Sequence, residues 1–147
     1  MALTKVGNGG IENVTNSANA TFLTIDASEQ ITVASEGGAV TTSVQQGLAK
    51  SWVNFNGTGT IAARDSFNHS SLNDNGTGDY TVNFTNSMGN ANYLSLNIAS
   101  YDSQNLGPSG ETKTRATGSV RFETRYQGNN TIYDHEDCYV LIHGDLA

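Results

Sequence analysis

Residues 73–84, NDNGTGDYTVNF, place a glycine-rich turn directly before a segment of alternating apolar and polar residues. In an extended chain Tyr80, Val82 and Phe84 point to one side, and the threonine and asparagine between them point to the other. The glycines, among them Gly78, accept the tight backbone that a turn requires. The stretch therefore predicts a hairpin that leads into a half-buried β-strand.

The same alternation recurs through the C-terminal two thirds of the chain, between turns rich in Gly, Asn and Asp. Several short strands at this spacing are typical of an antiparallel β-sandwich, so the expected fold class is all-β. The last segment is apolar on both faces, which places it at the centre of a sheet or in a subunit contact. The expected strands after residue 50 are 52–55, 60–72 (one longer or broken strand), 80–84, 93–101, 118–126 and 138–144.

The segment 93–101 carries two leucines and an isoleucine on one face, and Tyr93 and Tyr101 on the other, more polar face. We expect the two tyrosines to pack at the edge of the core, with stacking on a sugar or on another subunit as the alternatives. The stretch 103–118, which contains the single proline Pro108, is expected to be the longest loop.

The N-terminal part of the chain has a different texture. Its first twenty residues are rich in Gly, Asn and Ser, while 21–26 and 30–35 predict a small hairpin. A short helix is expected only in 39–51, against the poor helix propensity of its Thr, Ser and Val residues. The chain is thus expected to divide into an extended N-terminal arm or adaptor, 1–50, and a sandwich domain, 51–147.

The composition suits a polar β protein and excludes several classes of partner. Of the 147 residues, 36% are hydrophobic and 14% charged, and the formal net charge is −7. The seven Lys and Arg residues are scattered and form no basic patch, so neither nucleic-acid binding nor attraction to an anionic membrane is expected. No apolar run is long enough for membrane insertion, and MALTKVGNGG lacks the apolar core of a signal peptide.

No arrangement of residues predicts catalysis. The chain has three histidines, and no serine lies in a G-x-S-x-G turn. Its glycines lead into strands, whereas phosphate-binding glycine loops lead into helices. Cys138, the single cysteine, is expected to be a small buried apolar residue. We therefore expect no enzymatic activity and no cofactor.

The densest polar cluster is YDHEDC, residues 133–138. Because alternate residues of a strand share a face, Asp134 with Glu136, or His135 with Asp137, could contact one cation. Two ligands are fewer than a protein cation site ordinarily supplies. The expected structure is a solvated loop between strands, without a metal.

Three charged residues, Arg121, Glu123 and Arg125, share one face of the strand expected at 118–126. The structural interpretation is ion pairing with neighbouring strands, worth ~0.2–1 kcal/mol per pair. The functional interpretation is recognition of a sugar or of a neighbouring subunit, since a guanidinium is a planar fork of donors. The sequence alone leaves both open.

The segment 49–93, AKSWVNFNGTGTIAARDSFNHSSLNDNGTGDYTVNFTNSMGNANY, resembles a module found at the ends of tailed-bacteriophage fibre proteins. The opening MALTKVGNGGIE and the segment TFLTIDASEQIT also look like pieces of such proteins. This resemblance implies a virion structural protein that assembles as a homotrimer. The motifs that carry it are Trp52–Thr58, Arg64–Phe67, Asp74–Phe84 and Ala91–Tyr93.

A more distant resemblance is to the H-type lectin sandwich, a six-stranded trimer that binds sugars between subunits. It is carried by the strands YTVNF, VRFE and CYVLIHG. The resemblance implies a glycan site in which Arg121 is the polar anchor and Tyr133 and His135 supply ring contacts.

These features lead us to expect a trimeric, fibre-tip-like virion protein that is made in the host cytoplasm and contributes to recognition of a host-surface glycan. Residues 1–50 would bind other virion proteins. The alternative is a capsid decoration protein, a knob or head fibre, anchored to the shell by its N-terminal arm. The two hypotheses differ in whether the protein sits on the tail or on the capsid exterior.

Overall fold

The computed structural model describes residues 23–25, 31–34, 41–100, 109–126 and 128–147. By its internal contacts the chain divides into two compact units, Met1–Val44 and Gln45–Ala147. Most of the predicted arm, 1–50, lies outside the described residues.

The first unit contains a small antiparallel sheet. Its strands follow the chain order, β1 (Leu23–Ile25), β2 (Ile31–Ala34) and β3 (Thr41–Ser43). The predicted hairpin is confirmed, because β1 and β2 pair in antiparallel register. A four-residue helix, α1 (Val44–Gly47), follows directly and confirms the short helix expected in this stretch.

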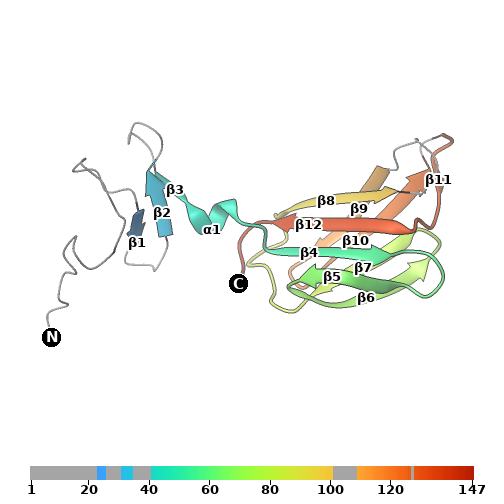
Figure 1. Cartoon of the computed structure of the whole chain (residues 1–147), viewed down its shortest axis with the longest axis horizontal. Helices are drawn as coiled ribbons and strands as arrows, with labels where there is room; N and C mark the ends of the chain where they lie inside the picture. The colour runs from blue at the N-terminus through green and yellow to red at the C-terminus, as the bar shows by residue number, and fades with distance from the viewer. Residues whose placement is uncertain (1–22, 26–30, 35–40, 101–108, 127) are drawn as a thin grey trace, which may run out of the picture. The chain divides into compact units, whose positions relative to one another are not determined.

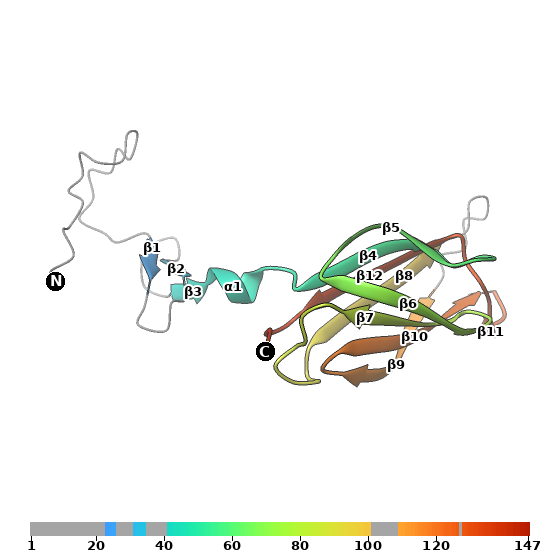
Figure 2. The same ribbon diagram turned by 90° about the horizontal axis from the view of Figure 1, so that it is seen from below.

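The second unit is built from two antiparallel sheets that lie face to face (Figures 1 and 2). One sheet has the order β5-β4-β12-β8. In the other, β6, β7 and β10 are successive neighbours, and β9 and the short β11 also pair with β10. This confirms the predicted antiparallel β architecture. The strands are β4 (Ser51–Asn56), β5 (Ala62–Phe67), β6 (His69–Gly76), β7 (Asp79–Phe84), β8 (Leu94–Ser100), β9 (Ser109–Ala116), β10 (Ser119–Tyr126), β11 (Thr131–Ile132) and β12 (Asp137–His143).

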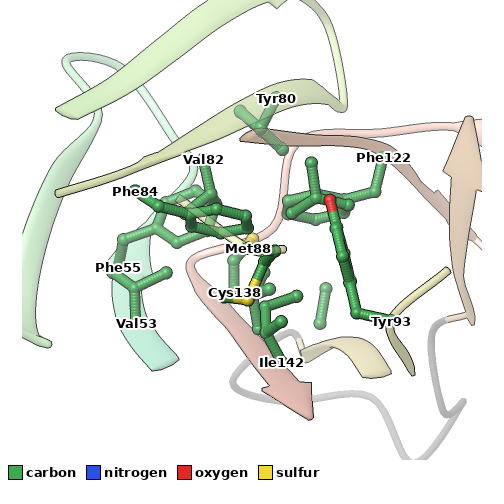
Figure 3. Close-up of a cluster of buried hydrophobic side chains, with 13 residues drawn as sticks. Val53, Phe55, Tyr80, Val82, Phe84, Met88, Tyr93, Phe122, Cys138 and Ile142 are labelled. Atoms are coloured by element: carbon green, nitrogen blue, oxygen red, sulfur yellow. The ribbon is translucent and has the colours of Figure 1, made fainter. Parts of the chain in front are cut away.

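The core lies between the two sheets and is formed by every second residue of their central strands (Figure 3). Aromatic rings join the sheets. The Phe55 ring centroid lies 5.2 Å from that of Tyr80 and 6.2 Å from that of Phe122, both in edge-to-face orientation. Cys138 is also fully buried, as its sequence context predicted. Strict alternation in β4 and β7 thus places one face of each strand in a dry interior.

A sharp corner moves the chain from one sheet to the other. Asn68, between β5 and β6, adopts a left-handed conformation with φ 53°. Its side-chain amide donates to the carbonyls of Lys50 and Asn86, at 2.9 and 3.1 Å, and its side-chain oxygen accepts from the Asn86 N–H at 2.7 Å. Asparagine tolerates this backbone better than most residues. The segment 60–72 is therefore a broken strand whose halves belong to different sheets.

The structure corrects the loop expected at 103–118. Residues 109–116 form β9, which pairs with β10 from Ser119 to Arg125 and brings the described part of the second unit to nine strands rather than six or seven. The charged and hydroxylated side chains of GETKTRA suggested a loop. They occur in a strand because its outer face is exposed, where polar residues cost little.

In the segment 93–101, the polar side faces the core and the apolar side faces outward. Tyr93 is 5% exposed, and its hydroxyl donates to the Ser119 carbonyl at 2.7 Å, which confirms packing at the core edge. The more polar side of β8 therefore faces inward. Leu94, Leu96 and Ile98 face outward and are 48–56% exposed. Tyr101 lies outside the described residues.

Candidate functional site

The outer face of the five-stranded sheet is polar and carries Arg121. The guanidinium of Arg121 donates two hydrogen bonds to the carboxylate of Asp79 on β7, from Nε to Oδ1 at 2.8 Å and from Nη2 to Oδ2 at 2.6 Å. The hydrogen bond from Arg121 lowers the pKa of Asp79 below its usual value. Since 48% of the Arg121 side chain is exposed, the guanidinium is held in one orientation and still faces solvent.

A second ion-pair network lies beside it on the same face. Arg125 contacts Glu123 at 2.7 Å and Glu111 on β9 at 3.2 Å, and Lys113 contacts Glu123 at 3.2 Å. Glu123 is only 8% exposed because its two partners cover it. The structural interpretation of Arg121, Glu123 and Arg125 as ion-pairing residues is therefore confirmed. We call this surface, the outer face of β6, β7, β10 and β9, the polar face.

Tyr133 and His135 lie together in the connection between β11 and β12. Their rings meet edge to face with centroids 5.5 Å apart. Tyr133 is 45% exposed, whereas His135 is 2% exposed, so only the tyrosine offers surface to a ligand in the isolated chain. The His135 Nδ1 lies 3.0 Å from the Tyr133 carbonyl oxygen, so a backbone contact also joins the two residues.

Of the three residues expected to bind a glycan, Tyr133 and His135 are in contact with each other, and Arg121 lies apart from them. Tyr133 is anchored to Thr124, whose hydroxyl donates to the Tyr133 carbonyl at 2.7 Å. Thr124 is buried on the inner face of β10, whereas Arg121, three residues earlier, is on its outer face. Among the described residues, no hydrogen bond or ion pair links Arg121 to Tyr133 or His135.

Two of the three acidic residues of 133–138, Asp134 and Asp137, have structural partners. The Asp134 carboxylate accepts from the Gly78 N–H at 2.5 Å and from the buried Tyr80 hydroxyl at 2.8 Å. Asp137 pairs with Arg64 at 2.6 Å. These carboxylates therefore tie the segment to the β6–β7 turn and to β5. Within the described residues, no group of three or more His, Cys, Asp or Glu could hold a metal ion.

The same interior makes Cys138 a poor nucleophile. Its thiol is fully buried and lies 3.5 Å from the His135 carbonyl. Burial raises the pKa of the Cys138 thiol to about 12, so the reactive thiolate is scarce at neutral pH.

Sequence reasoning identified only the last strand of an apolar surface that extends over the outer face of the four-stranded sheet. Antiparallel pairing places Leu96, Leu141, Trp52 and Phe67 in one row across β8, β12, β4 and β5. A hollow in this surface is lined mainly by Trp52, Leu96, Ile98, Tyr139 and Leu141. We call the apolar side chains that point outward from this sheet the apolar face, which consists of Trp52, Phe67, Leu94, Leu96, Ile98, Tyr139 and Leu141. Asn54 and Asp65, which are paired across β4 and β5, point to the same side.

A sequence signal for this face existed in β12 and β8. The segment CYVLIHG is apolar on both sides, and the structure places β12 centrally, between β4 and β8, with Tyr139 and Leu141 outward. The leucines of β8 alternate as those of a core-facing strand do. Only the sheet register shows that β8 and β12 present their apolar residues to the same outer surface.

Comparison with known proteins found no matching family model, no matching curated protein and no matching solved structure. In the part of the chain that the structure describes, no helix has the length and apolar character needed to span a membrane.

Proposed function

We propose that this protein is a bacteriophage virion structural protein, a trimeric fibre-tip-like protein with an H-type-lectin-like sandwich, which contributes to recognition of a host-surface glycan. The observation that carries the proposal is the segment 49–93. Its resemblance to a phage fibre module coincides with β4, the β5–β6 corner, the β6–β7 hairpin and the buried Tyr93. The resembling residues thus form β4 to β7, which belong to both sheets, and supply about half of the described core.

The glycan part of the proposal assigns Arg121 as polar anchor and Tyr133 as stacking surface, with His135 positioning the tyrosine ring. It is supported by the exposure of both contact residues and by the preorganisation of Arg121 through Asp79. Two donors of the guanidinium are occupied, and the planar fork retains further N–H groups that suit sugar hydroxyls or carboxylates.

The location of the protein is tested by imaging phage particles decorated with an antibody raised against the purified protein. Label at the tail tip is the expected result. Label over the capsid would favour the decoration alternative, in which the separate N-terminal unit, Met1–Val44, grips the shell. Particles without label would contradict both forms of the proposal.

Recognition is tested by binding of the purified protein to host cells. We expect Arg121→Ala to lose cell binding while it keeps the wild-type oligomeric mass. Its melting temperature should fall only slightly, because an exposed ion pair such as Arg121–Asp79 contributes about 1 kcal/mol or less. The matched control is Arg115→Ala on β9, an exposed arginine without an ion pair among the described residues, which should bind normally. If Arg121→Ala binds cells as well as the control does, Arg121 is not the anchor.

A further inference from the structure

The apolar face is larger than the fold requires. The inner residues of the same strands, among them Val53, Phe55, Val140 and Ile142, already supply the core. The outer residues contribute nothing to that core, yet Leu94, Ile98 and Phe67 are 53–56% exposed. Strands that are apolar on both faces are typical of a sheet that is covered on both sides.

The composition of the rest of the molecule makes this surface more informative. Only 36% of the residues are hydrophobic, and the opposite outer surface, the polar face, is covered by ion pairs. The exposed apolar side chains are therefore concentrated rather than scattered. Half of a large side chain corresponds to roughly 100 Å², so the apolar face offers roughly 600 Å² in all, at the upper limit for a soluble monomer.

The area and the apolar character of the face identify the partner. Two charged groups at its edge, Arg64 and Asp137, pair with each other at 2.6 Å, which leaves the exposed Asp65 as a single charge beside Phe67 on β5. The hollow is lined mainly by aliphatic and aromatic side chains, with Asn54 as its polar side chain, and offers few donors to a sugar. A second copy presents the same apolar surface, and roughly 600 Å² per subunit approaches the roughly 800 Å² per partner of a stable interface.

We propose that the apolar face is the contact between copies of this chain. Trp52 and Leu141 lie at its centre, since they are direct neighbours across β4 and β12. Tyr139, Ile98 and Leu96 surround them and exclude water on association. The number of copies, three, rests on the proposed function, whereas the choice of face does not.

The test uses the full-length chain and measures its mass by light scattering at micromolar concentration. Leu141→Arg places an unpaired charge in the centre of the contact, so we expect this variant to be monomeric. Ile98→Thr, which keeps a β-branched residue in the strand, should weaken association without disturbing the fold. Thr114→Arg puts the same charge on the polar face and should keep the wild-type mass. Far-UV circular dichroism verifies that each variant is folded.

The single tryptophan of the chain gives a second readout that needs no mutation. Dilution of the wild-type protein should separate the copies, shift the Trp52 emission to longer wavelength and increase its quenching by acrylamide. A monomeric wild type overturns the inference. A wild-type mass for folded Leu141→Arg also overturns it. A monomer whose Trp52 is protected from acrylamide would instead assign residues 1–44 of the same chain as the cover. None of these outcomes depends on where the protein lies on a virion.

Discussion

The bond between Arg121 and Asp79 makes a definite prediction about acid stability. Because hydrogen bonding from Arg121 lowers the pKa of Asp79, the folded protein holds this proton less tightly than the unfolded chain does. The pair therefore stabilises the fold at pH values above the ordinary aspartate pKa of about 4. This stabilisation is lost as the pH falls through the lowered pKa of the folded state.

Asp79→Asn removes this titration. We expect the urea midpoint of the variant to fall less steeply than that of the wild type between about pH 5 and pH 2. The control is Asp65→Asn on β5, an exposed aspartate whose carboxylate accepts a bond from the Ser66 N–H and has no arginine partner among the described residues. The control should keep the wild-type slope. Equal slopes for Asp79→Asn and the wild type would contradict the assignment.

The partner of Arg121 could not be read from the sequence, although the arginine itself could. The two residues are 42 positions apart, and they meet only because β10 pairs with β7 in one particular register. A shift of one residue would move Arg121 to the other face of the sheet. The burial of His135 could not be predicted either, because a single histidine in a polar segment gives no indication of whether its side chain is buried. Sequence therefore identified the candidate residues but not their contacts.

Among the elements, the β6–β7 hairpin depends on one backbone position, Gly78. Gly78 has φ +60°, and its N–H and C=O contact Asp134 and Thr124. A Cβ there would lie 2.7 Å from the Tyr133 carbonyl oxygen and 2.8 Å from that of Thr124. Two rigid backbone atoms would thus have to move.

Gly59 provides a matched control, because it has φ +61° and a Cβ added there would meet no atom within 4 Å. Gly59→Ala should cost about 1–2 kcal/mol, the penalty of the left-handed backbone alone. Gly78→Ala should cost about 2 kcal/mol more, because overpacking is added. Urea unfolding of the two variants measures the difference. Similar losses would show that the hairpin end relaxes around the added methyl group.

The elements also show where sequence patterns work and where they fail. Strict alternation located β4, β7 and β10 correctly, because one face of each is in the core and the other meets water or polar groups. It failed for β9, an edge strand whose exposed residues are polar enough for a loop. It also failed to show which side of β8 faces the core, because apolar residues on an outer face follow the same period as those that face a core.

At the scale of the whole molecule, the buried core of the described residues lies entirely between Val53 and Ile142. The second compact unit, Gln45–Ala147, therefore contains all of the described hydrophobic core. The apolar face and the polar face also belong to this unit. The segment 1–44 is thus available for a task other than stabilising the sandwich, and the proposed function assigns it to anchoring on another virion component.

Deletion of residues 1–44 tests whether this segment anchors the protein without stabilising the sandwich. We expect the truncated protein to keep the β-rich circular dichroism spectrum and nearly the melting temperature of the full chain, because no residue of the described core is removed. We also expect it to keep the wild-type association state, since the apolar face is intact. Incorporation into phage particles, measured by immunoblotting of purified virions, should be lost. Normal incorporation of the truncated protein would place the anchor in the sandwich, and failure to fold would show that the two units depend on each other.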